Sequence, residues 1–90
     1  MANVVITLKI MPESPDSDLD LIASKATEII NKTGEVGKKE IVPIAFGLSA
    51  INLIFVMDED KGSTEELEKE VASLENVVSA EVTDVRRAVG

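Results

Sequence analysis

The sequence of 90 residues contains no cysteine, no histidine, no tryptophan and no tyrosine. Without cysteine, the chain can form neither a disulfide framework nor a thiol nucleophile. Without histidine, it lacks the side chain that most often transfers protons near neutral pH and most often binds metal ions. Because no nucleophile is recognisable beside a base either, we expect no catalytic residue, no metal site and no cofactor.

Positive charge is also scarce, because 9 Lys and Arg oppose 17 Asp and Glu and give a net charge of −8. A surface this acidic repels the phosphates of nucleic acids and attracts basic protein surfaces. An RNA-binding sheet would also need aromatic residues for base stacking on its central strands, and the predicted strands lack them. We therefore expect no direct contact with nucleic acid.

Long apolar runs are missing too: none reaches the 18 residues of a membrane-spanning helix, and no basic segment leads into an apolar signal core. The hydrophobic content of 44% is typical of a globular chain,. The sequence has no linker and no low-complexity segment. We expect one domain over residues 1–90, cytoplasmic, without membrane contact and monomeric when free.

Four segments carry the residue pattern of strands, and two carry the spacing of amphipathic helices. The predicted strands are 3–11, 35–44, 49–57 and 77–86, and the predicted helices are 17–31 and 63–75.

The first helix has an apolar stripe formed by Leu19, Ile22, Ala23, Ala26, Ile29 and Ile30. We expect Asp16 or Ser17 to cap its start and Gly34 to end the helical region.

The second helix is expected to begin with a capping box, in which Ser63 bonds a backbone amide and Glu66 reaches back. Its outer face is expected to be solvated: Glu65, Glu66, Glu68, Lys69 and Glu70.

The positions of charge and proline predict which strands lie at the sheet edges. Strand 35–44 contains Pro43 and a charged segment, both of which are tolerated at an edge. Strand 77–86 carries Glu81 and Asp84, whereas strand 49–57 is apolar on both sides and suits the centre. The order β-α-β-β-α-β with the usual crossover handedness predicts an α+β fold, the ferredoxin-like sandwich. Its antiparallel sheet has strand order 4-1-3-2, with both helices on one face.

A tight turn at Ala45, Phe46 and Gly47 joins strand 35–44 to strand 49–57. Gly47 can adopt the positive φ that such turns need. The turn places Phe46 at the tip of a hairpin, where burial is least expected. An aromatic side chain held out on a turn indicates contact with a partner, although single exposed apolar residues are also common.

Two charged segments have two interpretations each. Arg86 and Arg87 are either a frayed tail or the one concentrated positive spot of an acidic protein. The run from Asp58 to Asp60 is either a divalent-cation site or a solvated loop. The loop is favoured, because the later ligands of a calcium loop are missing.

Two apolar surfaces are open to interpretation as well. The uncovered sheet face is either an interface or a half-apolar solvated face, and its expected members are Val5, Ile54, Val56 and Val85. The proline-rich segment 11–15 is either a docking surface or, as we favour, a rigid connection.

Four segments resemble archaeal elongation factor 1-beta and, more loosely, the C-terminal exchange domain of the eukaryotic factor: 11–16, 43–47, 56–64 and 81–87. The resemblance covers the whole chain. It implies a guanine-nucleotide exchange factor that promotes replacement of GDP by GTP on elongation factor 1-alpha, the GTPase of translation elongation, without covalent chemistry of its own. It also implies the ferredoxin-like fold.

The resemblance implies partner-binding residues at two places. The hairpin aromatic of the family corresponds to Phe46, followed by Gly47. The lysine that the eukaryotic domain presents towards the magnesium and phosphate-loop region corresponds to Arg87, beside Arg86. Since Phe46 and Arg87 should lie at opposite ends of the sheet, we expect two separate anchors. The alternatives are a ligand-binding regulatory domain of the same fold and a structural subunit of a complex.

Overall fold

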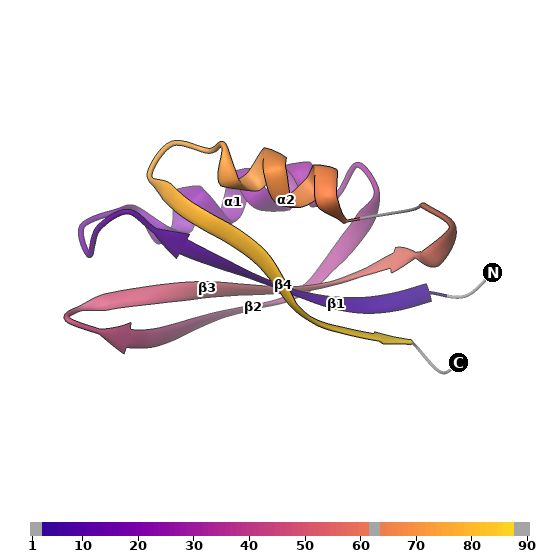
Figure 1. Cartoon of the computed structure of the whole chain (residues 1–90), viewed down its shortest axis with the longest axis horizontal. Coiled ribbons are helices and arrows are strands. Elements are labelled where there is room, and N and C mark those ends of the chain that lie inside the picture. Colours follow the sequence, from indigo (N-terminus) through magenta and orange to yellow (C-terminus); the bar gives the residue numbers. More distant parts are fainter. Residues whose placement is uncertain (1–2, 62–63, 88–90) are drawn as a thin grey trace.

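The computed structural model describes residues 3–61 and 64–87. Its elements are β1 (Asn3–Pro12), α1 (Leu19–Ile30), β2 (Gly34–Ala45), β3 (Leu48–Asp58), the short 3₁₀ helix η1 (Glu59–Lys61), α2 (Glu65–Ala72) and β4 (Val77–Arg87). The strands form one antiparallel sheet in the order β2-β3-β1-β4. Both helices cover the same face of that sheet (Figure 1). The predicted α+β architecture and strand order are confirmed.

The core lies between the sheet and the two helices, and it follows the alternation that the sequence predicted. In β1 and β3 every second residue is buried, because successive side chains of a strand point to opposite faces. The buried cluster comprises Ile6, Leu8 and Ile10 of β1, Ile51, Leu53, Phe55 and Met57 of β3, Ile22, Ala23, Ala26 and Ile30 of α1, Leu67 and Val71 of α2, and Val77 of β4. No helix in the described ranges is long and apolar enough to cross a membrane.

The ends of α1 differ from the prediction. Asp18 caps the helix, since its side chain accepts a hydrogen bond from the Leu21 amide at 3.1 Å. Asp16 and Ser17 were therefore the wrong caps. The Ser17 hydroxyl instead accepts the Ser14 amide at 3.2 Å and closes the preceding turn.

Gly34 was predicted to end the helical region, but in the structure it is the first residue of β2. The helix ends at Ile30 with Asn31 as its cap. A Cβ atom at Gly34 would lie 2.5 Å from the Val56 carbonyl oxygen. Glycine is needed there because the two backbones approach too closely for any side chain.

The start of α2 is only partly described. Thr64 is the N-cap residue, and its side chain makes no capping hydrogen bond. The predicted bonds between Ser63 and the helix, including the reach of Glu66 back to Ser63, lie outside the described residues.

Strand β4 contains two extra residues relative to β1, Val78 and Thr83, which the sequence did not reveal. Val82 pairs with Leu8 and Asp84 pairs with Thr7, so Thr83 is left without a partner in β1. This is a β-bulge, which shifts the side-chain alternation of all later residues by one.

The bulge moves Val85 away from the face where it was predicted. Val85 lies opposite Ile6, a core residue, and therefore points to the helix-covered side. The prediction that Val85 shares the open face was wrong. Val5 and Val56 lie opposite each other on the open face, as predicted, with Ile54 beside them.

Candidate functional site

The hairpin between β2 and β3 turns through only two residues. Ala45 pairs with Leu48, which leaves Phe46 and Gly47 as the central residues of the turn. Their φ angles are 54° and 80°. Two positive φ values are typical of the type I′ turn, whose twist matches that of the strands. The predicted role of Gly47 as a positive-φ turn residue is confirmed.

Phe46 is an unfavourable residue for this position. Its side chain is 97% exposed, so it gains almost no burial from folding. The left-handed backbone costs a residue with a Cβ atom about 1–2 kcal/mol. An Asn or Gly would fit the turn better. Phe46 therefore strains the backbone without a gain from burial, and this combination indicates a role outside the fold,.

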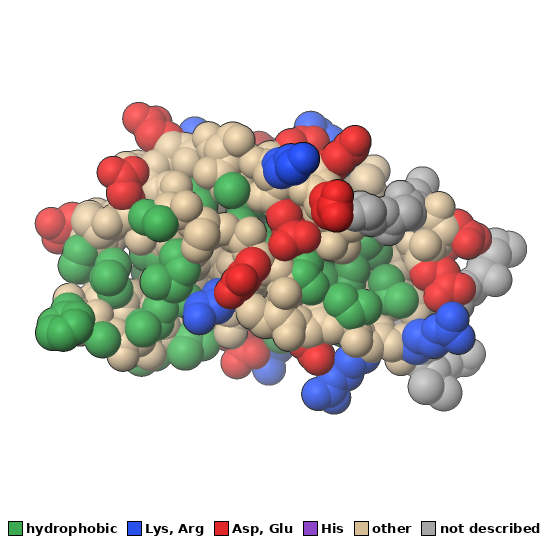
Figure 2. Space-filling view, viewed as in Figure 1, with side chains coloured by type: hydrophobic (Ala, Val, Ile, Leu, Met, Phe, Trp, Pro, Cys, Tyr) green, Lys and Arg blue, Asp and Glu red, His purple; other side chains and the backbone are tan. Residues whose placement is uncertain are grey.

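The residues that lead to the tip extend the apolar surface. Ile41, Val42 and Ile44 of β2 are all exposed, and with Phe46 we call them the hairpin patch. Ile41 and Val42 pair with consecutive residues of β3, so they lie on opposite faces of this edge strand,. Figure 2 shows hydrophobic side chains gathered over this end of the molecule. The sequence predicted the exposed tip but not the patch, because which side chains an edge strand exposes depends on its tertiary packing.

The loop after β1 supports the hairpin tip. A Cβ atom at Gly47 would lie 3.7 Å from Cβ of Pro15, so the turn rests against the proline ring. Both segments lie at the same end of the molecule (Figure 1). Segment 11–15 thus lies beside the hairpin tip, and its interpretation as a rigid connection stays a prediction.

Arg86 and Arg87 lie at the opposite end of the sheet. Arg87 is paired with Val4, which lies opposite the buried Met57, and therefore points to the helix-covered side. Arg86 points to the open face. The molecule is 42 Å long, and at roughly 3.3 Å per residue the stretch of β3 between the two ends spans about 30 Å. Phe46 and the two arginines thus lie at opposite ends of the sheet, as expected.

Each arginine has an acidic partner. Arg86 Nε lies 2.8 Å from Asp84 Oδ2, and Arg87 Nη2 lies 3.4 Å from Glu59 Oε2 of η1. Both arginines belong to β4 rather than to a frayed tail, and each forms an ion pair with a carboxylate. Because both guanidinium groups are largely exposed, such pairs contribute only about 0–1 kcal/mol, and either arginine can exchange its partner for another anion.

The acidic segment before α2 forms a local turn. Asp58 Oδ1 accepts the Asp60 amide at 2.9 Å, which starts η1. In residues 3–61 and 64–87, no three acidic side chains gather as a set of metal ligands. The preference for a solvated loop over a cation site stays a prediction.

Glu68 was expected to be solvated, and the structure corrects this. The side chain is half-buried. Its Oε1 accepts the Thr64 hydroxyl at 3.2 Å, and its Oε2 accepts the Val82 amide of β4 at 3.1 Å. Its place beside Leu67, at the border of the apolar stripe, is the only sequence signal of this contact.

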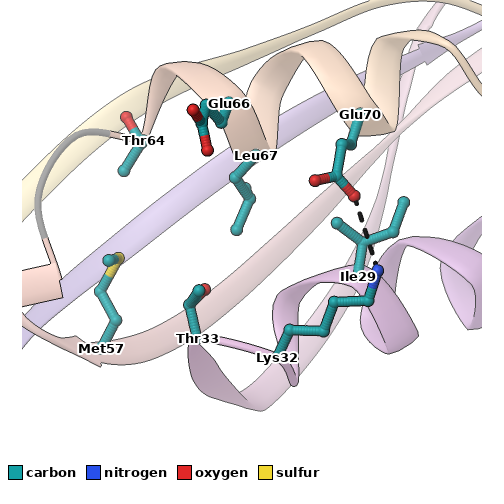
Figure 3. Close-up of a pocket in the computed structure, with 8 residues that line it drawn as sticks. All are labelled: Ile29, Lys32, Thr33, Met57, Thr64, Glu66, Leu67 and Glu70. Atoms are coloured by element: carbon teal, nitrogen blue, oxygen red, sulfur yellow. Dashed lines mark ion pairs between the residues drawn. The ribbon is translucent and has the colours of Figure 1, made fainter.

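A small cavity of about 110 Å³ lies between the two helices and β3. Figure 3 shows Lys32, in the turn after α1, and Glu70 of α2 facing each other across it, with Nζ and Oε2 3.8 Å apart. Within the described ranges, no buried side-chain nitrogen or oxygen lacks a hydrogen-bond partner. Ligand pockets usually measure about 300–1,000 Å³, so this gap is small for a metabolite site.

Comparison with known proteins identifies the family. Residues 5–88 match the EF-1 guanine nucleotide exchange domain. Elongation factor 1-beta of Methanobrevibacter smithii is 48% identical over 87 residues, which cover 97% of this chain and 98% of that protein. The proteins of the same name from Methanothermobacter thermautotrophicus and Staphylothermus marinus are 45% and 40% identical, each over 97% of this chain and 98% of their own length. The chain therefore belongs to the family of EF-1 guanine nucleotide exchange domains.

Proposed function

We propose that this chain accelerates the replacement of GDP by GTP on elongation factor 1-alpha during translation elongation, and that it binds the GTPase with both ends of its sheet. Family membership supports the reaction. The exposed, left-handed Phe46 carries the argument for the binding mode. The whole chain, residues 1–90, acts as one exchange domain, and it is cytoplasmic and monomeric when free.

The proposed reaction needs no covalent step in this chain. An exchange factor binds the nucleotide-free GTPase more tightly than the loaded form, and linkage requires that it weaken nucleotide binding by the same factor. This role suits a chain without Cys or His. It also involves no metal or cofactor of its own, no membrane and no direct contact with nucleic acid.

Arg87 is the proposed exchange element. It leaves Glu59 and places its positive charge near the magnesium and phosphate-binding region of the GTPase. There it competes with the metal and disturbs the contacts that retain GDP. Arginine presents a planar fork rather than the point charge of a lysine, so its contact differs in detail from that of the eukaryotic domain.

Phe46 is the proposed anchor at the other end, where Gly47 allows the turn. The exposed aromatic ring enters an apolar hollow on the partner, and the other apolar residues of the hairpin patch extend the contact along β2. Buried aromatic residues are frequent hot spots of protein interfaces.

The test measures release of labelled GDP from purified elongation factor 1-alpha, with and without this protein. We expect faster release that increases with the concentration of the protein and saturates. A regulatory ligand-binding domain or a purely structural subunit would leave the rate of GDP release unchanged, and that result would refute the proposed function.

A further inference from the structure

The β-bulge at Thr83 decides which arginine faces which side of the sheet. With the bulge, Arg87 lies opposite Val4 on the helix-covered side, and Arg86 lies opposite Val5 on the open face. A regular ladder beyond Val82 would shift every later residue by one position. Arg86 would then lie opposite Val4, and the two arginines would exchange faces.

Two side chains bond at the bulged part of β4: the Thr83 hydroxyl donates to the Thr7 carbonyl oxygen at 3.5 Å, and Glu68 reaches the strand from α2. Its Oε2 accepts the amide of Val82, the residue directly before the bulge. Because β4 is an edge strand, an amide that does not pair with β1 needs another acceptor,. Oε1 accepts the Thr64 hydroxyl at 3.2 Å, which fixes the carboxylate at the start of α2.

We propose that Glu68 is a positioning residue for nucleotide exchange, because its bond to Val82 holds the bulge that turns Arg87 to the helix-covered side. The inference rests on the proposed role of Arg87. Glu68 itself lies on α2 and acts through β4 rather than by touching the partner. The side on which Arg87 lies also allows its contact with Glu59 of η1 at 3.4 Å.

The first experiment replaces Glu68 and measures stimulated GDP release. Glu68→Ala and Glu68→Met both remove the acceptor, and Met keeps much of the side-chain length and packing. We expect each to lower the stimulated rate by about tenfold, as for loss of one charged hydrogen bond. Glu68→Gln should retain most activity, since its amide oxygen can accept from Val82 and its amide nitrogen can donate to Thr64.

Glu66→Ala is the matched control, because it removes the same charge from an exposed position of the same helix. It should leave exchange unchanged. Amide hydrogen exchange at Val82 gives an independent readout: it should accelerate in Glu68→Ala and Glu68→Met but not in Glu68→Gln or Glu66→Ala. Unaltered protection of the Val82 amide in the first two variants would overturn the inference.

A double-mutant cycle separates positioning from general stability. If Glu68 acts through Arg87, Arg87→Ala should lower the stimulated rate of GDP release at least about tenfold in the parent protein. In the Glu68→Met background the same substitution should lower that rate less than about twofold. Equal costs in both backgrounds would refute the positioning role while leaving Arg87 as the exchange element. If Arg87→Ala alone has no effect on GDP release, the proposed role of Arg87 fails, and the inference about Glu68 falls with it.

Discussion

At the scale of single residues, the two phenylalanines differ in burial and therefore in their contribution to the stability of the fold. Phe55 is completely buried in the centre of β3, where it contributes about 1.5–3 kcal/mol to folding. Phe46 is almost completely exposed and has a positive φ. Its side chain therefore contributes little to folding, and its backbone opposes it.

Changes at Phe46 should separate stability from exchange. Phe46→Gly should raise the free energy of unfolding by about 0.5–1 kcal/mol, because relief of the left-handed strain exceeds the entropy that glycine adds to the unfolded chain. Phe46→Ala should change it by no more than about 0.5 kcal/mol. Both should weaken binding to the GTPase by at least about 30-fold. Denaturant unfolding and titrated GDP release measure the two effects.

Asn76→Gly is the control, since Asn76 is also exposed and has a φ of 69°. It should leave binding and exchange unchanged. If Phe46→Ala unfolds much more easily than the parent, Phe46 contributes to the fold and the anchor is wrong.

Arg87 should affect the rate of exchange more than binding. Arg87→Ala should keep much of the affinity but lose most of the stimulation of GDP release, since the charge acts on the metal and phosphate region. Arg86→Ala should do less because it points to the other face, and Arg87→Lys should keep substantial activity. Lys25→Ala, at an exposed position of α1, controls for the change of net charge.

Near-normal exchange by the Arg86→Ala/Arg87→Ala double variant would show that this end of β4 is not the exchange element. The hairpin end would then be the remaining candidate. The measurement is single-turnover release of labelled GDP at saturating concentrations of each variant.

The residues that the sequence missed are those whose partners are distant in the chain. The exposed position of Phe46 on a turn follows from its neighbour Gly47 and from strand periodicity, which are both local signals. Glu59 and Glu68 look like solvated acids, because apart from the position of Glu68 beside Leu67 nothing near them in the sequence predicts contact with β4. Their contacts depend on how β4 packs beside α2 and η1, which is a property of the tertiary structure.

At the scale of the elements, β2 shows why two glycines of one strand have different importance. A Cβ atom at Gly34 would lie 2.5 Å from the Val56 carbonyl oxygen, whereas one at Gly37 would lie 3.8 Å from the Ile54 carbonyl oxygen. The sequence assigned Gly34 to the end of a helix because glycine often has that role. The close approach of β2 to β3 is the actual reason for it.

Gly34→Ala should therefore destabilise the fold by about 1–3 kcal/mol, since backbone atoms must move to admit the methyl group. Gly37→Ala should change stability by less than about 0.5 kcal/mol, because its Cβ would make only an ordinary contact. Thermal and denaturant unfolding of the two variants measure the difference. Similar stabilities for both would show that β2 can move away from β3 at little cost.

The elements themselves were predictable because each signal that defines them is short in range. Period-two and period-3.6 patterns predicted the strands and helices, and Pro43 with its charged neighbours predicted the edge position of β2. The bulge at Thr83 was not predictable, because it is a property of pairing between β4 and β1 rather than of the sequence of β4. For that reason the orientation of Val85 was predicted wrongly.

At the scale of the whole molecule, the sheet separates two unlike ends. One end carries the hairpin patch, and Figure 2 shows Lys and Arg side chains beside acidic ones at the other. The central strands β1 and β3 run from one end to the other through the buried core. This separation allows an apolar anchor and a charged exchange element to contact two separate regions of one partner.

The two ends should then act independently and on different quantities. Phe46→Ala should raise the concentration needed for half-maximal GDP release, whereas Arg87→Ala should lower the maximal rate. The free-energy effects of substitutions more than about 10 Å apart usually add within about 0.5 kcal/mol. The double variant should therefore show both defects, each as large as in the single variant. Titrations of all four proteins against elongation factor 1-alpha measure this cycle. If Phe46→Ala also lowered the maximal rate and Arg87→Ala then cost nothing further, the two ends would contact one common site, and the two-anchor binding mode would be wrong.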